Sequence, residues 1–224
     1  MTDIPTLATA TLAVSAVIAY FLGSLPTAYL AGRLYGKDIF SVGSRQAGAT
    51  NVFREVSRPA GIAVFLIDSA KGLFAMIAVR MLGLEGVWLL LPASAVIFGH
   101  WNSPFTRFRG GDGVSSLTGV VLGIAPLAAL IPYTLIGFIT LRFNSKLEHP
   151  TLWGAIAGYL LYLALTLGGV FPVEPIIVAG VTGLGFAILL HSLTYHRRHV
   201  EQSEAHQAAL AEADHERKFG NRRS

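Results

Sequence analysis

Three polar segments of the chain carry residue types that could do chemistry. The first covers residues 36–54 and combines glycines with hydroxyl and amide side chains and with two arginines. The candidate ligands in it are Ser44, Thr50, Asn51, Arg45 and Arg54. Glycines let backbone N–H groups approach an oxyanion closely, and arginine adds a bidentate donor. This composition favours the binding of a phosphate group.

The second segment covers residues 99–116 and contains a glycine-rich run that we expect to open directly into a helix. Its candidate binding positions are His100, Gly110, Gly111, Asp112 and Gly113. Amides at a helix N-terminus form a ready anion site, because the helix dipole and the unpaired N–H groups both favour negative charge. A glycine run alone is a weak signal, so the neighbouring donors matter to this prediction.

The third segment lies at the end of the last apolar stretch. Its candidates are His191, Thr194 and Arg197. His196 and His199 are close by, but their spacing matches no familiar metal-ligand set. The chain also has no cysteine, which excludes a thiolate site and a thiol nucleophile. We therefore predict no metal and no cofactor, and three donor-rich segments that together favour phosphate binding.

Asp68 and Lys71 stand inside an otherwise apolar stretch. Residues three apart lie on one face of a helix and can pair. Ionisable residues within a membrane usually face the interior of a helix bundle and are often functional. A structural ion pair and a role in the site therefore both stay open, and we favour the structural pair.

The composition is that of an integral membrane protein. Hydrophobic residues make up 53% of the chain and charged residues 13%, and the mean hydropathy is +0.56. A soluble domain carries about 25% charged residues. Since a membrane helix needs about 20 apolar residues, the candidate spans are 7–30, 60–82, 87–100, 114–141, 150–167 and 175–193. The fourth is too long for one straight helix, and Pro126 offers a break.

The basic residues give an orientation. All but two of the 17 lysines and arginines fall in four segments, which are 33–58, 102–112, 142–149 and the tail from residue 191. Cytoplasmic loops carry an excess of basic residues. The four segments lie on one side only if the chain has about seven helices, with its N-terminus outside and its C-terminus inside. We thus predict an all-α transmembrane domain over residues 1–195 and a cytoplasmic, charged helical tail over residues 196–224.

In order along residues 10–197, these motifs resemble the bacterial acyl-phosphate:glycerol-3-phosphate acyltransferase family. The first similarity is Gly23-Ser24-Leu25-Pro26, followed by Gly36-x-Asp38-Ile39 and by Gly43-Ser44-x-x-x-Gly48-Ala49-Thr50-Asn51-x-x-Arg54. The Asp68 and Lys71-Gly72 positions are also similar. The second motif follows through Gly99-His100, Pro104, Phe108, Gly110-Gly111 and Gly113-Val114.

The resemblance implies a seven-helix membrane enzyme that transfers a fatty acyl group from acyl phosphate to the 1-hydroxyl of glycerol 3-phosphate. It implies catalytic roles for Ser44, Arg54 and His191, and substrate-binding roles for the other candidates named above. It also implies a reaction without a metal or a protein base, since the phosphate of the donor takes the proton. We expect membrane lipid around the protein, no nucleic-acid partner, and an active face on the cytoplasmic side of the cell membrane.

Three departures from the family pattern leave alternatives open. Arg45 and Gln46 replace a Gly-Asn pair, Asp112 replaces a phosphate-binding lysine, and Thr194 replaces an asparagine. One hypothesis is that Arg45 reaches Asp112 or replaces the lysine. The chain could be a working acyltransferase with a rearranged pocket, a paralogue that acylates another acceptor, or a non-catalytic protein that binds an anionic lipid.

Overall fold

The computed structural model describes residues 6–126, 128, 135, 139, 150–171 and 173–195. The chain forms two compact units, Met1–Phe186 and Ala187–Ser224, and each is described by itself. Every regular element in the described ranges is helical, which confirms the all-helical prediction. The loop around Arg142 and Lys146 and the tail from residue 196 lie outside the described residues.

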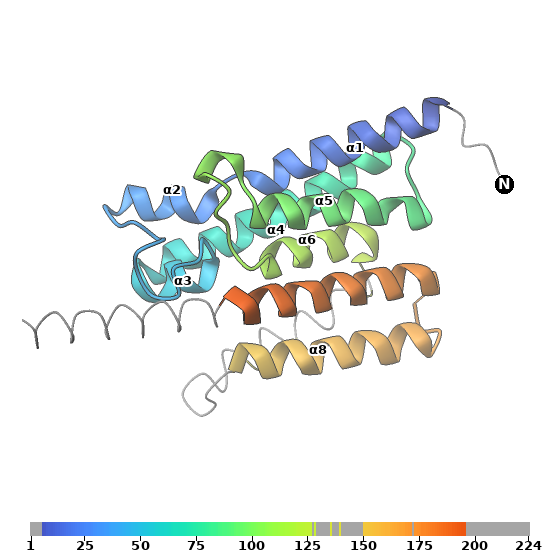
Figure 1. Ribbon diagram of the computed structural model, residues 1–224. Helices are drawn as coiled ribbons and strands as arrows, with labels where there is room; N and C mark the ends of the chain where they lie inside the picture. The colour runs from blue at the N-terminus through green and yellow to red at the C-terminus, as the bar shows by residue number, and fades with distance from the viewer. Residues whose placement is uncertain are drawn as a thin grey trace, which may run out of the picture. The chain divides into compact units, whose positions relative to one another are not determined.

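The helices of the first unit follow one another along the chain as Figure 1 shows. They are α1 (Thr6–Ser24), α2 (Thr27–Leu34), α3 (Ala49–Glu55), α4 (Arg58–Met81), α5 (Leu90–Trp101), α6 (Val114–Ile124) and α8 (Pro150–Leu167), with short 3₁₀ turns at Gly86–Leu89 and Pro104–Thr106. A further helix runs over Pro175–Tyr195. Proline stands in the first turn of α4, where its missing N–H costs nothing.

Three helical segments of the described chain are long and apolar enough to cross a membrane. They are Thr9–Leu34, Arg58–Met81 and Pro175–Tyr195. On α4, the side chains of Leu66 and Phe74 are each 59% exposed. Large apolar side chains that point outward from a helix suit a lipid environment better than water, because burying apolar surface is favourable.

The first predicted span, residues 7–30, is interrupted in the structure. α1 ends at Ser24 and α2 begins at Thr27. Pro26 causes the break, because proline disfavours helical backbone in the residue before it and donates no hydrogen bond. The break frees the carbonyl of Leu25, which accepts a hydrogen bond from Lys71 Nζ at 2.7 Å. The irregular backbone at this break is thus compensated by a buried cation from α4.

The predicted break near Pro126 is present. α6 ends at Ile124, and Ala125 leaves the helical region with φ −141° and ψ 71°. Arg80, in the last turn of α4, donates from Nη1 to the carbonyl of Gly123 at 2.9 Å. A cation at a helix C-terminus satisfies carbonyls that have no partner within the helix and complements the dipole.

α1 and α5 pack closely because each presents a glycine to the other's backbone. A Cβ on Gly23 would lie 2.1 Å from the carbonyl oxygen of Val96, and one on Gly99 would lie 2.2 Å from that of Tyr20. Both distances are far below van der Waals contact. This packing places the end of α1 beside the end of α5, where His100 lies.

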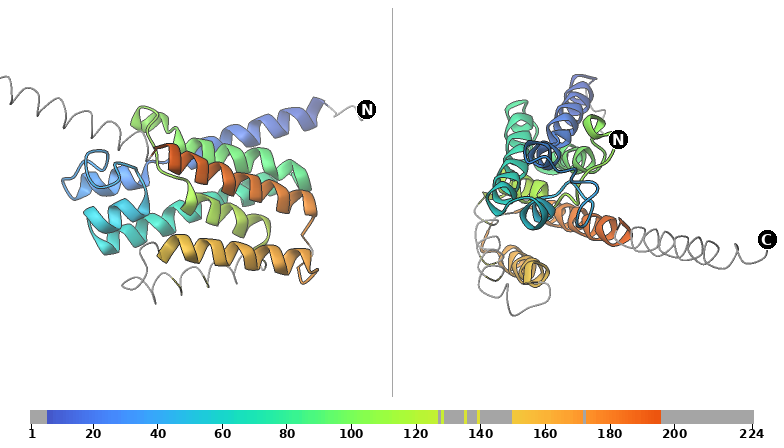
Figure 2. Two further views of the ribbon diagram at one scale, coloured as in Figure 1. Left: turned by 60° about the horizontal axis from the view of Figure 1, so that its bottom comes forward. Right: turned by 90° about the vertical axis from the view of Figure 1, so that its left-hand side faces the viewer.

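α4 and α6 form a second close pair, and Figures 1 and 2 show them side by side. A Cβ on Gly72 would lie 2.3 Å from the carbonyl oxygen of Ser116, and one on Gly119 would lie 1.7 Å from that of Ser69. Small residues that let backbones approach are typical of helix pairs in membranes. This pair brings Lys71 and Asp68 of α4 toward the start of α6.

We expect Gly119→Ala to destabilise the protein, because the added methyl group meets the backbone of α4. The net cost should be about 1–3 kcal/mol, as for other overpacked interfaces. Thermal unfolding in detergent measures it. The matched control is Gly183→Ala, where a Cβ meets nothing within 4 Å. That change should be neutral or stabilise the helix by about 0.5–1 kcal/mol. Equal stability of the two variants would contradict the close α4–α6 packing.

Candidate active site

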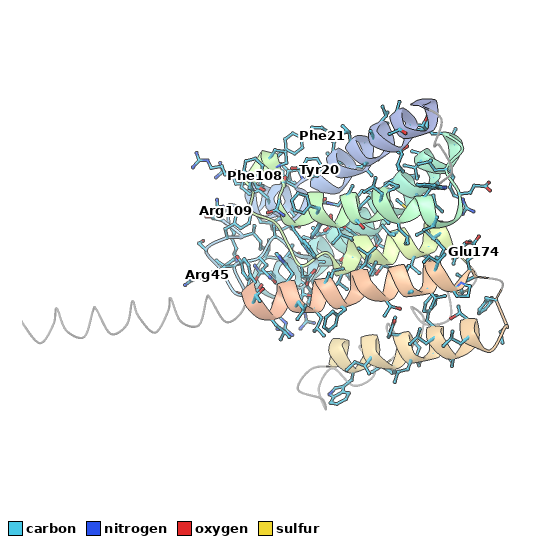
Figure 3. The ribbon with its side chains drawn as sticks, turned by 45° about the vertical axis from the view of Figure 1, so that its right-hand side comes forward. Tyr20, Phe21, Arg45, Phe108, Arg109 and Glu174 are labelled. Carbon is cyan, nitrogen blue, oxygen red and sulfur yellow. The ribbon has the colours of Figure 1, made fainter. Side chains whose placement is uncertain are left out.

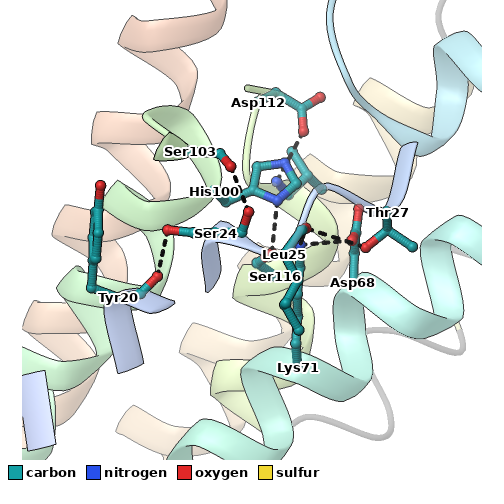
Figure 4. A network of polar contacts seen from close by, with 11 residues as sticks. Tyr20, Ser24, Leu25, Thr27, Asp68, Lys71, His100, Ser103, Asp112 and Ser116 are labelled. Atoms are coloured by element: carbon teal, nitrogen blue, oxygen red, sulfur yellow. Dashed lines mark hydrogen bonds and ion pairs between the residues drawn. The ribbon is translucent and has the colours of Figure 1, made fainter. Parts of the chain in front are cut away.

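A narrow pocket lies where α1 ends against α4 and against the segment that follows α5. It is lined by residues 23–28, by Ala47 of the first polar segment, by Asp68 and Lys71 of α4, and by residues of the 100–111 segment. Figure 4 shows the polar contacts around it. The second motif and the pair within α4 therefore meet at one place, although they are far apart in the sequence.

The first polar segment is organised by Asn51. Its side-chain amide donates to the carbonyls of Ile39, Val42 and Gln46 at 2.9–3.1 Å, and its oxygen accepts the N–H of Ser44 at 3.2 Å. Asn51 is 4% exposed. These four bonds make its amide the anchor of the loop. Direct contact between Asn51 and a substrate stays a prediction.

The other four candidates of this segment are exposed. They are Ser44, Arg45, Thr50 and Arg54. Thr50 and Arg54 are four residues apart on α3, so they lie on one face of that short helix. None of the four lines the pocket, whereas Ala47 does. The structure therefore brings the loop to the pocket through its backbone, and these side chains lie outside the lining.

The glycine run is fixed against the first polar segment and α5. The N–H of Ala47 donates to the carbonyl of Gly110 at 3.1 Å, and that of Gly111 donates to the carbonyl of His100 at 3.3 Å. A Cβ on Gly110 would lie 1.9 Å from the His100 carbonyl oxygen. Gly113, with φ +94°, precedes α6 in the left-handed conformation that glycine adopts without strain.

Asp112 occupies part of the expected anion site. Its Oδ1 accepts the N–H of Val114, the first residue of α6, at 3.0 Å. Its carbonyl accepts a hydrogen bond from the indole N–H of Trp101 at 2.6 Å. The carboxylate thus bonds to the start of α6, and the hypothesis that Arg45 reaches Asp112 or replaces the lysine stays a prediction.

His100 is buried at the end of α5. Its Nδ1 lies 3.2 Å from Oγ of Ser116 on α6, a contact whose donor depends on the tautomer. Its Nε2 faces Gly111, where an added Cβ would lie 2.5 Å away. The imidazole therefore connects α5, α6 and the glycine run. It also lines the pocket, and its predicted role in substrate binding stays a prediction.

The pair within α4 is present and buried. Lys71 Nζ lies 2.9 Å from Oδ1 of Asp68, and the two side chains are 4% and 1% exposed. Lys71 also holds the free carbonyl of Leu25. The pair thus ties α4 to the break after α1, as the structural interpretation expects. It also lines the pocket, and a role in the reaction stays a prediction.

Sequence reasoning assigned no site role to five polar residues of the lining. They are Ser24, Thr27, Ser103, Thr106 and Arg109. The guanidinium of Arg109 lies 4.2 Å from the centre of the Phe40 ring, a cation–π contact. Figure 3 shows Arg109 and Arg45 at one end of the first unit and Glu174 at the other. The basic residue before the glycine run was the signal that could have identified Arg109.

The third segment belongs to the second unit. The hydroxyl of Thr194 donates to the carbonyls of Leu190 and His191, each at 2.9 Å. The rings of His191 and Tyr195 are 6.4 Å apart. Arg197 lies outside the described residues. The hydroxyl of Thr194 is therefore used within its own helix, and the roles of all three candidates stay predictions.

These features define a class: a membrane protein with a polar pocket lined by hydroxyl groups, an imidazole, an arginine and a buried ion pair. A family model described as glycerol-3-phosphate acyltransferase matches residues 13–203. The chain belongs to this family. Within the described residues, no group of three histidine, aspartate or glutamate side chains could hold a metal ion.

Relatives and solved structures give the same family. A glycerol-3-phosphate acyltransferase of Geobacter metallireducens is 45% identical over 113 residues, which are 50% of this chain and 58% of that protein. One of a Synechocystis species is 41% identical over 165 residues, or 67% and 73% of the two chains. Several matches span less than two thirds of the relative's length.

Two crystal structures of PlsY (YgiH), an integral membrane glycerol 3-phosphate acyltransferase, share the fold. The glycerol 3-phosphate form aligns with a TM-score of 0.68 and 26% identity over 87% of this chain and 92% of that one. The lysophosphatidic acid form aligns with a TM-score of 0.64.

Proposed function

We propose that this chain transfers a fatty acyl group from acyl phosphate to the 1-hydroxyl of glycerol 3-phosphate. The product is lysophosphatidic acid, a precursor in phospholipid synthesis. The observation that carries the proposal is the pocket in which the glycine run meets His100, Lys71 and Arg109, in a chain of this family. Donors and cations at that point suit a phosphate-bearing substrate.

Acyl transfer from acyl phosphate requires little from the protein beyond positioning of the substrates and stabilisation of charge. The 1-hydroxyl oxygen attacks the acyl carbonyl carbon, the bond from that carbon to the phosphate oxygen breaks, and the phosphate leaves with the proton. An acyl phosphate is already an activated anhydride. Holding the two substrates together and stabilising the developing charge can therefore supply most of the rate. Arg109, at the exposed side of the pocket, would bind phosphate.

The candidates outside the lining keep their proposed roles. Ser44 and Arg54 would act on the donor's phosphate, with Arg45 and Thr50 beside them in the same segment. His191 keeps its proposed catalytic role, and Thr194 and Arg197 keep their proposed substrate-binding roles. What supports this assignment is that Ala47, three residues from Ser44, lines the pocket.

We further propose a multi-pass protein of about seven membrane helices in the cell membrane, with its N-terminus outside and the active face cytoplasmic. The break after Ile124 and the gathering of basic residues in four segments support this topology. Residues 1–195 would form the transmembrane domain and residues 196–224 a cytoplasmic tail.

A direct assay tests the activity. Purified protein receives palmitoyl phosphate with and without glycerol 3-phosphate, and inorganic phosphate and lysophosphatidic acid are measured. We expect phosphate release that depends on the acceptor and equals lysophosphatidic acid formed. Phosphate release that ignores the acceptor, or no release, would contradict the proposal; binding of anionic lipid without turnover would favour a non-catalytic lipid-binding protein.

One observation favours a second candidate acceptor. The Asp112 carboxylate stands at the N-terminus of α6, where it repels a phosphate and can accept hydrogen bonds from hydroxyl groups. An acceptor without phosphate would meet no such repulsion. Adding glycerol in place of glycerol 3-phosphate to the same assay distinguishes the two, and we expect glycerol 3-phosphate to be preferred.

A further inference from the structure

The carboxylate of Asp68 lines the pocket and has one oxygen without a donor. The residue is fully buried, and its Oδ2 accepts no hydrogen bond from the described residues. Lys71 Nζ lies 2.9 Å from the other oxygen, Oδ1, and also donates to the carbonyl of Leu25. A buried carboxylate oxygen without a donor is costly, so the site is built for a group that donates.

The protein's own hydroxyl groups at the pocket do not supply that donor, because all four donate to backbone carbonyls. Ser24 donates to Tyr20, Thr27 to Leu25, Ser103 to Ser24, and Thr106 to Ser103. Figure 4 shows several of these contacts around Asp68 and Lys71. Within the described residues, Oδ2 of Asp68 therefore remains an acceptor without a donor at this pocket.

The charge and the acceptor character of the Asp68 carboxylate determine which ligand group can bind to it. A phosphate dianion offers no proton to donate and is repelled by a carboxylate. A ligand ammonium would be repelled by Lys71, which lies against the same carboxylate. An alcohol fits both constraints, since it is neutral and donates one hydrogen bond. The narrow space suits a group as small as one hydroxyl.

We propose that Asp68 binds the 2-hydroxyl of glycerol 3-phosphate, the hydroxyl that is not acylated. This inference rests on the proposed function and adds a specificity-determining residue to it. The reacting 1-hydroxyl must approach the phosphate of the donor, which a neighbouring carboxylate would repel. Asp68 thus holds the polyol end of the acceptor, while Arg109 and the glycine run receive its phosphate.

The test compares two acceptors that differ in one hydroxyl, glycerol 3-phosphate and 3-hydroxypropyl phosphate. The wild-type protein should prefer glycerol 3-phosphate by about 10- to 100-fold in kcat/KM and in Kd measured by calorimetry, as expected for a hydrogen bond to a charged group. In Asp68→Leu/Lys71→Met, which removes both buried charges together, the preference should fall to within about threefold of unity.

Asp68→Asn is the matched variant, because it keeps the shape and one oxygen acceptor. It should retain an intermediate preference. Wild-type protein that does not distinguish the two acceptors, or variants that keep the full preference, would overturn the proposal. Equal losses for both acceptors would show that Asp68 only supports the fold. Calorimetry reads the preference without turnover, so failure of the acyl-transfer assay alone would reject the proposed activity and leave the binding role of Asp68 to be judged separately.

Discussion

Gly111→Ala should lower kcat/KM for glycerol 3-phosphate by at least about 100-fold, because displacements of about 1 Å at a site can cost that much. A Cβ at this position would lie 2.5 Å from the carbonyl oxygen of Ala47 and 2.5 Å from Nε2 of His100. The methyl group must therefore push the first polar segment away from the glycine run or displace the imidazole. Each displacement changes the pocket itself, and phosphate release in the palmitoyl phosphate assay measures the loss.

The control is Gly48→Ala, a glycine-to-alanine change in the first polar segment. Nothing lies within 4 Å of a Cβ there, and the backbone of Gly48, at φ −127° and ψ 157°, suits any residue. We expect kcat/KM within about twofold of the wild type, since the substitution adds no contact and no strain. If both variants lose activity equally, the loss in Gly111→Ala does not arise from the close contacts of Gly111 with Ala47 and His100.

Asp112→Lys should lower the KM for glycerol 3-phosphate by at least about tenfold. Two unit charges about 4 Å apart interact by roughly 1 kcal/mol in water and by about 4 at an intermediate dielectric. A free energy of ~1.4 kcal/mol corresponds to a tenfold change in affinity. Replacing a negative charge by a positive one near a phosphate dianion therefore changes its binding free energy by several times that amount. The change also frees the N–H of Val114, which Asp112 now occupies.

Asp112→Asn separates the effect of charge from that of the hydrogen bond to Val114. The side-chain oxygen of asparagine can accept the same N–H but carries no charge. It should give a smaller decrease in KM, while only the lysine variant should lose about 1 kcal/mol of stability through the lost hydrogen bond to Val114. A higher KM in both variants would mean that the carboxylate holds the acceptor and that the pocket is tuned to another substrate.

Local signals in the sequence predicted much of the fold. Proline at position 126 predicted the end of α6, and the structure ends that helix at Ile124. The break at Pro26 was missed because its neighbours are apolar, so the stretch looks like one continuous span. The mean hydropathy of a stretch identifies segments that can face lipid. It does not respond to the single backbone N–H that a proline removes.

The pocket was harder to predict because long-range contacts build it. The resemblance selected His100 and the glycine run, and the structure places His100, Gly110 and Gly111 in the pocket lining. Nothing in the local sequence shows that the N–H of Ala47 reaches Gly110, or that the serine and threonine hydroxyls of the pocket are already bonded to carbonyls. Those contacts depend on how α1, α4 and α5 pack, and they decide which polar group remains available to a ligand.

The contact between Arg80 and the end of α6 bears on how the protein enters the bilayer. α6 has 11 residues, so it rises only about 16 Å, roughly half the thickness of the hydrocarbon layer. Carbonyls left without donors in lipid are costly. The Gly123 carbonyl finds its donor on α4, which is synthesised earlier. We therefore expect α4 to be in place before α6 settles in the membrane.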